Sequence, residues 1–191
     1  DGNELTYNQR GELIVSGPIY YNVTIPSSKI INLDMKGFVL TTTKSIINNG
    51  TLNITDSSSD KNSKIYSSFG IELIKNNGTL NMSDFELSIS STGNNTCGIV
   101  NSGTATLNNG TITSGYYGIK NSTTGILNLN GTNVTAANTA VYDEGELHVD
   151  GGTINGTSYG IYNYSSVDSD VSDATLSSNS NALYKYSRSS V

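Results

Sequence analysis

The hydrophobic residues of this chain recur in short alternating segments rather than in long runs. After residue 45, aliphatic side chains take every second position of a segment, as in TLNIT at 51–55, and Gly, Asn, Ser or Asp separate the segments. Alternation with a period of two is typical of β-strands with one buried face. No stretch has the 3.6-residue period of an amphipathic helix, and the chain contains only two prolines. The pattern therefore predicts an all-β fold of many short strands.

The segments belong to a repeat of about 20 to 28 residues, a length typical of solenoids. Each repeat contains three apolar segments, for example ATL (105–107), TIT (111–113) and GIK (118–120). Turn signals related to Gly-Thr-Leu begin the repeats at Gly50, Gly78, Gly103, Gly125 and Gly145, with a decayed form around Ser169.

Alignment of the repeats places the aliphatic residues in three columns. The first column contains Ile31, Leu33, Leu52, Ile54, Leu80, Met82, Ala105, Leu107, Leu127, Leu129, Leu147, Val149 and Val171. The second contains Leu87, Ile112, Val134, Ile154 and Leu176. The third contains Ile46, Ile71, Ile99, Ile119, Val141, Ile161 and Leu183. Three ladders of stacked side chains, about 4.8 Å apart from coil to coil, predict a triangular parallel β-helix of about seven to eight coils.

A small residue precedes the third column in most repeats. The residues at this place are Gly70, Gly98, Gly118, Ala140, Gly160 and Ala182, which predicts a tight corner. The residues one position earlier, expected inside or at that corner, are Phe69, Cys97, Tyr117, Thr139, Tyr159 and Asn181. Because Cys97 is the only cysteine, the chain has no intramolecular disulfide, and we expect this thiol to be a small buried hydrophobe.

The repeat divides the chain into an irregular N-terminal cap or opening coil at 1–28 and β-helix coils at 29–191, within one domain. Pro18 and Pro26 interrupt the rhythm of the first segment. No amphipathic capping helix is visible at either end. An uncovered solenoid end is an open strand edge, so end-to-end self-association is one expectation for this chain.

Composition limits the partners. Charged residues make up 14% of the chain, below the roughly 25% of ordinary domains. The net charge is −6, and the ten Lys and Arg residues form no basic cluster. Phosphate binding requires concentrated basic residues, so nucleic acid is excluded as an expected partner. No apolar run reaches the roughly 18 residues of a membrane-spanning helix, so we expect no membrane insertion.

The cassettes GTLNIT (50–55) and GELHVDGGTINGTSYGIYN (145–163) resemble the pectate-lyase-like right-handed parallel β-helix repeats of bacterial cell-surface adhesins. Such repeats are common in Gram-positive gut bacteria and in some autotransporter passengers. The resemblance covers about residues 29–187. It implies a right-handed β-helix in an extracellular protein, secreted or attached to the cell surface, in which this region is a binding domain or a stalk.

The same fold also carries polysaccharide lyases and glycoside hydrolases, which need grouped carboxylates. The best candidates here are Glu146, His148, Asp150 and Asp170. Glu146, His148 and Asp170 are expected to point outward on adjacent coils. The alternative is a solvated face in which the histidine replaces an amide in the column Asn53, Asn81, Thr106, Asn128, His148, Asp170. This second interpretation leads us to expect no catalytic residues, with a polysaccharide-active enzyme as an alternative.

A calcium site is the one cofactor alternative. Carboxylates alternate in DSDVSD (168–173), as hard oxygen ligands can. The segment lacks the Gly and terminal Glu of an EF-hand loop, and it lacks the glycine-rich nonapeptide of calcium β-rolls. Turn chemistry explains the aspartates equally well, so we expect no metal and no other cofactor.

Tyrosines form the clearest candidate binding site. The outward positions of the third strand are predicted to be Glu72, Val100, Lys120, Tyr142, Tyr162 and Tyr184, and Tyr164 and Tyr186 lie two residues further on. The chain has twelve tyrosines and no tryptophan. An exposed aromatic row can stack on sugar rings or pack against a protein, although it can also be a self-stabilising stack. We therefore predict a non-enzymatic adhesin or stalk domain that binds a glycan or a host surface protein through these five tyrosines.

Overall fold

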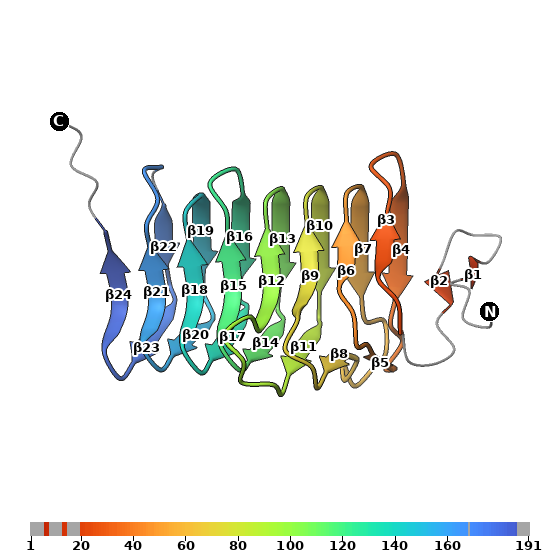
Figure 1. The fold of residues 1–191 in the computed structure, drawn as a ribbon, viewed down its shortest axis with the longest axis horizontal. Helices are drawn as coiled ribbons and strands as arrows, with labels where there is room; N and C mark the ends of the chain where they lie inside the picture. Colours follow the sequence, from red (N-terminus) through yellow and green to blue (C-terminus); the bar gives the residue numbers. More distant parts are fainter. Residues whose placement is uncertain (1–5, 8–12, 15–19, 168, 187–191) are drawn as a thin grey trace.

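The computed structural model describes residues 6–7, 13–14, 20–167 and 169–186, and within these ranges every regular element is a β-strand. Strands β3 to β24 wind into a solenoid whose coils follow one another along a single axis (Figure 1). Each coil contributes one strand to each of three sheets.

The first sheet consists of β4 (Ile30–Asp34), β7 (Thr51–Thr55), β10 (Thr79–Ser83), β13 (Thr104–Asn108), β16 (Ile126–Asn130), β19 (Glu146–Asp150) and β22 (Asp170–Ser172). The second consists of β5 (Val39–Thr41), β8 (Lys64–Ser67), β11 (Glu86–Ile89), β14 (Thr111–Ser114), β17 (Asn133–Ala136), β20 (Thr153–Gly156) and β23 (Thr175–Ser178). The third consists of β3 (Val23–Ile25), β6 (Ile46–Asn48), β9 (Glu72–Asn76), β12 (Cys97–Asn101), β15 (Tyr117–Asn121), β18 (Thr139–Asp143), β21 (Tyr159–Asn163) and β24 (Asn181–Lys185). The predicted all-β parallel β-helix, with three short strands per coil and about seven coils, is confirmed.

The first two predicted hydrophobic columns are ladders of the core. Leu80 pairs in register with Leu52 on one side and Ala105 on the other, and Ile112 pairs with Leu87 and Val134. Most of these side chains are fully buried, and each buried aliphatic residue stabilises the fold by roughly 1.5–3 kcal/mol. Stacking of like residues from coil to coil thus forms one continuous core.

The third predicted column is wrong at one coil. Ile74, not Ile71, pairs with Ile46 and Ile99, and Ile71 is only partly buried. The corner before β9 therefore lies three residues later in the sequence than predicted. The run IELIKN (71–76) offers two registers, and only the one through Ile74 brings Asn76 level with its neighbours on β6 and β12.

The same three-residue shift corrects three further predictions. Leu73 occupies the place opposite Gly98 that was assigned to Gly70, and Lys75 takes the outward position assigned to Glu72. Phe69, expected at the corner, is 53% exposed. In the other coils the small residue is required. A Cβ on Gly118 would lie 2.4 Å from Val134 Cγ1 and 2.5 Å from the Ala140 carbonyl oxygen. Cys97 is buried in this corner, as predicted.

The two ends of the solenoid differ. Strands β1 (Thr6–Tyr7) and β2 (Leu13–Ile14) pair antiparallel and β2 contacts β4, while the rest of segment 1–19 lies outside the described residues. Ile31 and Leu33, the first members of their ladders, are each 6% exposed. At the other end, Val171 is 39% and Leu183 54% exposed. The core is therefore covered at the N-terminal end and open at the C-terminal end.

Candidate functional site

The predicted tyrosines come together on the outer face of the third sheet. Tyr162 pairs in register with Tyr142 and Tyr184, on β18 and β24. The ring centroids of Tyr142 and Tyr162 are 5.4 Å apart at an interplanar angle of 8°, and those of Tyr162 and Tyr184 are 4.9 Å apart at 23°. Tyr164 and Tyr186 form a parallel stack, with centroids 4.7 Å apart at 29°. We call these five residues the tyrosine strip.

Two further tyrosines, Tyr117 and Tyr159, contact rings of the strip edge-on. The ring of Tyr159 meets Tyr162 edge-on at 4.9 Å, and Tyr117 meets Tyr142 edge-on at 6.0 Å. Edge-to-face and offset-stacked pairs each add about 0.5–1.5 kcal/mol beyond burial. The rings are therefore held in fixed positions before any partner arrives.

The stacking decides which parts of the rings face outward. Both faces of the Tyr162 ring are covered, one by Tyr142 and the other by Tyr184. The ring edges of Tyr162 remain for a partner. The Tyr142 hydroxyl donates a hydrogen bond of 3.3 Å to Glu144. Burial against its neighbours and the charge of Glu144 raise the pKa of Tyr142 to about 12, so this hydroxyl stays protonated and its one proton is donated to Glu144.

On the N-terminal side, the row of outward tyrosines ends at Lys120. Lys120 occupies the position level with Tyr142, and Val100 is level with Lys120 one coil earlier. The Lys120 ammonium lies 4.5 Å from the centroid of the Tyr117 ring, a cation–π contact. The tyrosine strip therefore spans the last three coils of the described chain.

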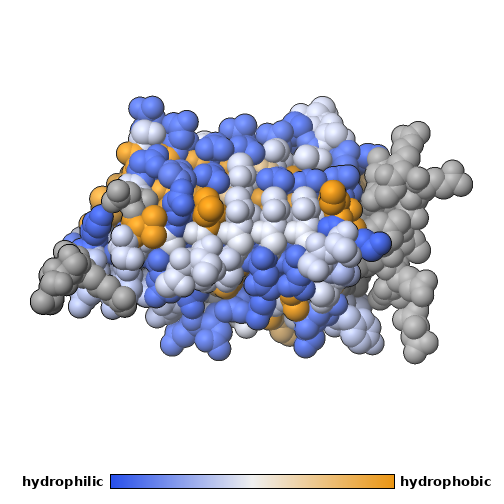
Figure 2. Space-filling view, turned by 90° about the horizontal axis from the view of Figure 1, so that it is seen from above, coloured by the Kyte–Doolittle hydropathy of each residue, from blue (hydrophilic) through white to orange (hydrophobic). Residues whose placement is uncertain are grey.

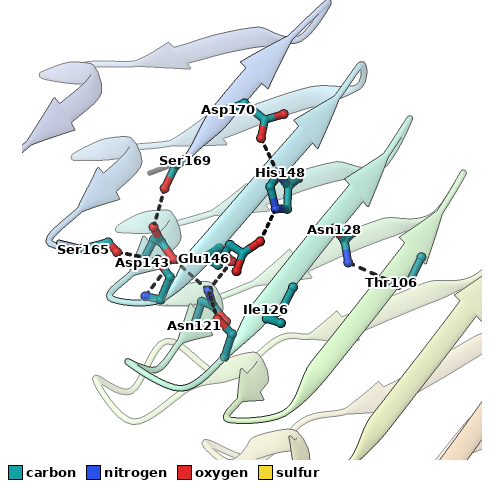
Figure 3. A network of polar contacts seen from close by, with 12 residues as sticks. Thr106, Asn121, Ile126, Asn128, Asp143, Glu146, His148, Ser165, Ser169 and Asp170 are labelled. Atoms are coloured by element: carbon teal, nitrogen blue, oxygen red, sulfur yellow. Dashed lines mark hydrogen bonds and ion pairs between the residues drawn. The ribbon is translucent and has the colours of Figure 1, made fainter. Parts of the chain in front are cut away.

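A second polar group lies on the outer face of the first sheet (Figure 3). The predicted outward column is confirmed here, because Asn128 pairs in register with His148 and His148 with Asp170. His148 Nε2 is 2.7 Å from Glu146 Oε1, and its Nδ1 contacts Asp170. Hydrogen bonds to Glu146 and Asp170 raise the pKa of His148.

This arrangement gives the histidine a structural role between two carboxylates. Both ring nitrogens are engaged, so the imidazole separates Glu146 from Asp170 instead of leaving a space for a sugar between them. The fourth candidate, Asp150, is exposed at the end of β19, where Ser172 Oγ lies 3.5 Å from its Oδ1. No group of three or more His, Cys, Asp or Glu side chains among the described residues is placed to hold a metal ion, and Asp168 lies outside them.

A buried polar ladder was missed by the sequence reasoning. At the last position of the six strands β6, β9, β12, β15, β18 and β21 in the third sheet, an amide or carboxylate points inward and is almost fully buried. The members are Asn48, Asn76, Asn101, Asn121, Asp143 and Asn163. From Asn48 to Asn121, each Nδ2 donates to the Oδ1 of the next coil at 2.7–2.8 Å. The recurring Asn-Xaa-Gly at 48–50, 76–78 and 101–103 is the signal that could have predicted it.

At Asp143 the direction of hydrogen-bond donation along this ladder changes. Its carboxylate accepts from Asn121 at 2.8 Å on one side and from Asn163 at 2.9 Å on the other, and the Gly145 amide also donates to it. Burial raises the pKa of Asp143, and the hydrogen bonds from Asn121 and Gly145 oppose that shift. A buried acidic group therefore lies directly inside the corner between the third and first sheets, beside the tyrosine strip.

Comparison with known proteins identifies no relative of this chain. No protein-family model matches the chain, and searches of curated proteins and of solved structures also find no match. In the described ranges, no helix is present that is long and apolar enough to cross a membrane.

Proposed function

We propose that this chain is a binding domain of a secreted or cell-surface protein, similar in role to an adhesin, and that the tyrosine strip contacts a protein partner. The observation that carries the proposal is the stack of Tyr142, Tyr162 and Tyr184 on the outer face of the third sheet. Tyrosine is enriched at protein interfaces because it combines a large apolar area with one hydrogen-bonding group.

Rigidity supports the same function. A side chain that must be ordered on binding loses about 0.5–1.5 kcal/mol of entropy. Stacking within the strip and edge contacts from Tyr117 and Tyr159 hold these rings in place in the free protein. The partner therefore meets a preorganised surface.

The covered ring faces favour a protein over a glycan. Sugar rings stack on the open face of an aromatic side chain, and neither face of Tyr162 is open. Ring edges and phenol hydroxyls suit the mixed apolar and polar contacts of a protein interface. A glycan partner remains the alternative for the tyrosines at the margin of the strip, such as Tyr186, which is exposed.

An extracellular location is part of the proposal. It is supported by the resemblance of the repeat cassettes to adhesin repeats and by the low content of charged residues. The surface seen in Figure 2 is mainly hydrophilic or neutral, with hydrophobic residues in small patches. Such a surface suits a rigid spacer that carries one specialised contact face.

The experiment is a binding screen on arrays of extracellular proteins and of glycans. We expect wild type to bind a protein target and Tyr162→Ala/Tyr184→Ala to weaken that binding at least tenfold, a change of about 1.4 kcal/mol. Tyr162→Phe/Tyr184→Phe keeps the stack and isolates the hydroxyls. Thr135→Ala/Asn155→Ala, on the outer face of the second sheet, is the matched control. Equal protein binding by wild type and the alanine variant would overturn the proposal.

Self-association through the C-terminal coil is a second candidate, favoured by the exposure of Val171 and Leu183 at that end. A continuous filament also needs an open N-terminal end, where Ile31 and Leu33 are covered. Sedimentation of wild type and Leu183→Asp tests this candidate. Concentration-dependent assembly that the substitution abolishes supports it, and a monomer at all concentrations contradicts it.

A further inference from the structure

The acidic residues of this chain are concentrated in the segment that carries the tyrosine strip. Residues 121–184 contain no Lys or Arg, but they contain seven acidic residues: Asp143, Glu144, Glu146, Asp150, Asp168, Asp170 and Asp173. The other nine acidic residues and all ten basic residues lie outside this segment, so the rest of the chain has a charge of +1. About one third of the chain therefore accounts for the whole negative charge.

The fold joins these acids to the strip around one corner. Strand β18 ends at Asp143 and β19 begins at Glu146, so the outer faces of the third and first sheets meet at Glu144. Glu144 accepts the hydrogen bond from Tyr142, and Glu146 lies next to His148 on the adjoining face (Figure 3). Asp143 points inward and takes no part in this surface. The tyrosine strip and these partly exposed carboxylates thus adjoin at the corner, where Tyr142 contacts Glu144.

The protein itself contains an example of the contact that this surface favours. Lys120 takes the column position that Tyr142 has in the next coil, and its ammonium lies over Tyr117. Tyr159 is placed two coils after Tyr117 in the same column, with Thr139 between them, and contacts the strip. Beside Tyr159 the place that corresponds to Lys120 is taken by Tyr162, whose ring meets Tyr159 edge-on at 4.9 Å, and no Lys or Arg lies within 121–184.

We propose that the tyrosine strip and the adjoining carboxylates Glu144, Glu146 and Asp170 bind a protein segment rich in lysine and arginine. This inference rests on the proposed function, because it specifies the partner of the same strip. A guanidinium group can make two kinds of contact here: it can stack on a ring at the margin of the strip, such as the exposed Tyr186, and it can donate two hydrogen bonds to a carboxylate. Complementary charge also accelerates association and makes it dependent on salt.

The charged groups of this surface favour a cationic partner over an acidic or a neutral one. An acidic segment would meet Glu144, Glu146 and Asp170. Among the described residues after Lys120, the only Lys or Arg that could offset this charge is Lys185, at the end of β24. His148 lies between Glu146 and Asp170, and even a protonated ring leaves the group with Glu144 net negative. A neutral segment would gain the tyrosine contacts alone.

The test uses fluorescence anisotropy with three labelled peptides of equal length, rich in Arg and Ser, in Glu and Ser, or in Gly and Ser. We expect the arginine peptide to bind at least tenfold more tightly than the others and to lose affinity as salt is raised. Glu144→Gln/Glu146→Gln should weaken it about tenfold and reduce the salt dependence. Tyr162→Ala/Tyr184→Ala should weaken it by a similar factor. Circular dichroism confirms that each variant is folded.

The matched control removes two charges elsewhere. Asp84→Asn/Glu86→Gln changes the net charge by the same amount, and these residues pair with Lys61 and Lys64 in the N-terminal half. We expect little change in arginine-peptide affinity. An equal loss in this control would show attraction by net charge alone and would overturn the inference.

Two outcomes separate this inference from the proposed function. If the tyrosine substitutions weaken binding to a protein target but the three peptides bind equally, the strip binds protein and the cationic partner is wrong. If the tyrosine substitutions change no binding at all, both proposals fail.

Discussion

Asn121 donates a hydrogen bond of 2.8 Å to Asp143 at the one coil where the buried amide ladder contains a carboxylate. Asn163 donates to the other oxygen of the same carboxylate at 2.9 Å, so Asp143 accepts from both neighbouring coils. The amides on the N-terminal side donate only toward the C-terminus. A charged group is therefore held in the core next to the proposed binding surface, and it makes the stability of these coils sensitive to pH.

Replacement of Asp143 by asparagine should lower the free energy of unfolding at neutral pH by about 1 kcal/mol, because the new Nδ2 would face the Asn163 Nδ2 donor, and it should remove the pH dependence that this carboxyl group contributes. Burial raises the pKa of Asp143 above its ordinary value of 3.8, so the folded state favours the protonated form. A group with a raised pKa contributes stability at low pH, and this contribution is lost as the pH rises through the folded pKa. Urea unfolding across a pH series measures both effects. An unchanged pH dependence in Asp143→Asn would contradict the assignment.

The reverse substitution at Asn101 is the matched control for the ladder. Asn101 accepts from Asn76 and donates to Asn121 Oδ1 at 2.8 Å. Asn101→Asp would place a carboxylate oxygen against that acceptor and leave a buried charge without a second donor. We expect a loss of roughly 3 kcal/mol in the free energy of unfolding. A loss below about 1 kcal/mol would show that the amides reorient freely.

Substitution of His148 by glutamine should remove a pH-dependent attachment of the last coil. Hydrogen bonds to Glu146 and Asp170 raise the pKa of His148, so the protonated ring stabilises the pairing of β19 with β22. This contribution is complete below the ordinary pKa of 6.5 and is lost as the pH rises through the folded value. Hydrogen exchange of β22, corrected for intrinsic rates, should show less protection at about pH 8.5 than at about pH 5.5 in wild type. Equal pH dependence in His148→Gln would count against the role of the histidine.

The Cys97 thiol should react slowly with a disulfide reagent in the native protein. Burial raises its pKa to about 12, and its Sγ lies 3.2 Å from the carbonyl oxygen of Ile99. Because the thiolate is the reactive form, we expect native labelling at neutral pH to be on the order of a hundredfold slower than labelling in denaturant. Rapid labelling of the native protein would show that the third sheet opens locally at β12.

Truncation to alanine should affect the last two coils unequally. Ile161 is fully buried, whereas Leu183, its partner in register on β24, is 54% exposed. We expect Ile161→Ala to lower the free energy of unfolding by about 3 kcal/mol and Leu183→Ala by less than about 1 kcal/mol. Chemical denaturation of the two variants makes the comparison. Similar losses at both positions would mean that the C-terminal coil is covered in solution.

Most of the fold could be predicted because the repeat fixes it locally. Alternating aliphatic residues define strands, and their recurrence at a coil-length spacing leaves stacking as the way to bury them, as Leu80 does between Leu52 and Ala105. The failure at Ile71 has a physical cause. Two isoleucines three residues apart satisfy the hydrophobic pattern equally, and the choice of Ile74 depends on pairing with strands more than 20 residues away.

The sequence by itself determined the coil, the three ladders and the outward placement of the tyrosines and of His148, because these follow from a two-residue period repeated along the chain. Only the tertiary structure decided what those outward residues do to one another. It stacks Tyr142, Tyr162 and Tyr184 so that their faces are covered, and it places His148 between Glu146 and Asp170. It also places Asp143 among buried amides. Contacts between coils depend on side-chain rotamers and on register, and neither is contained in the pattern of a single repeat.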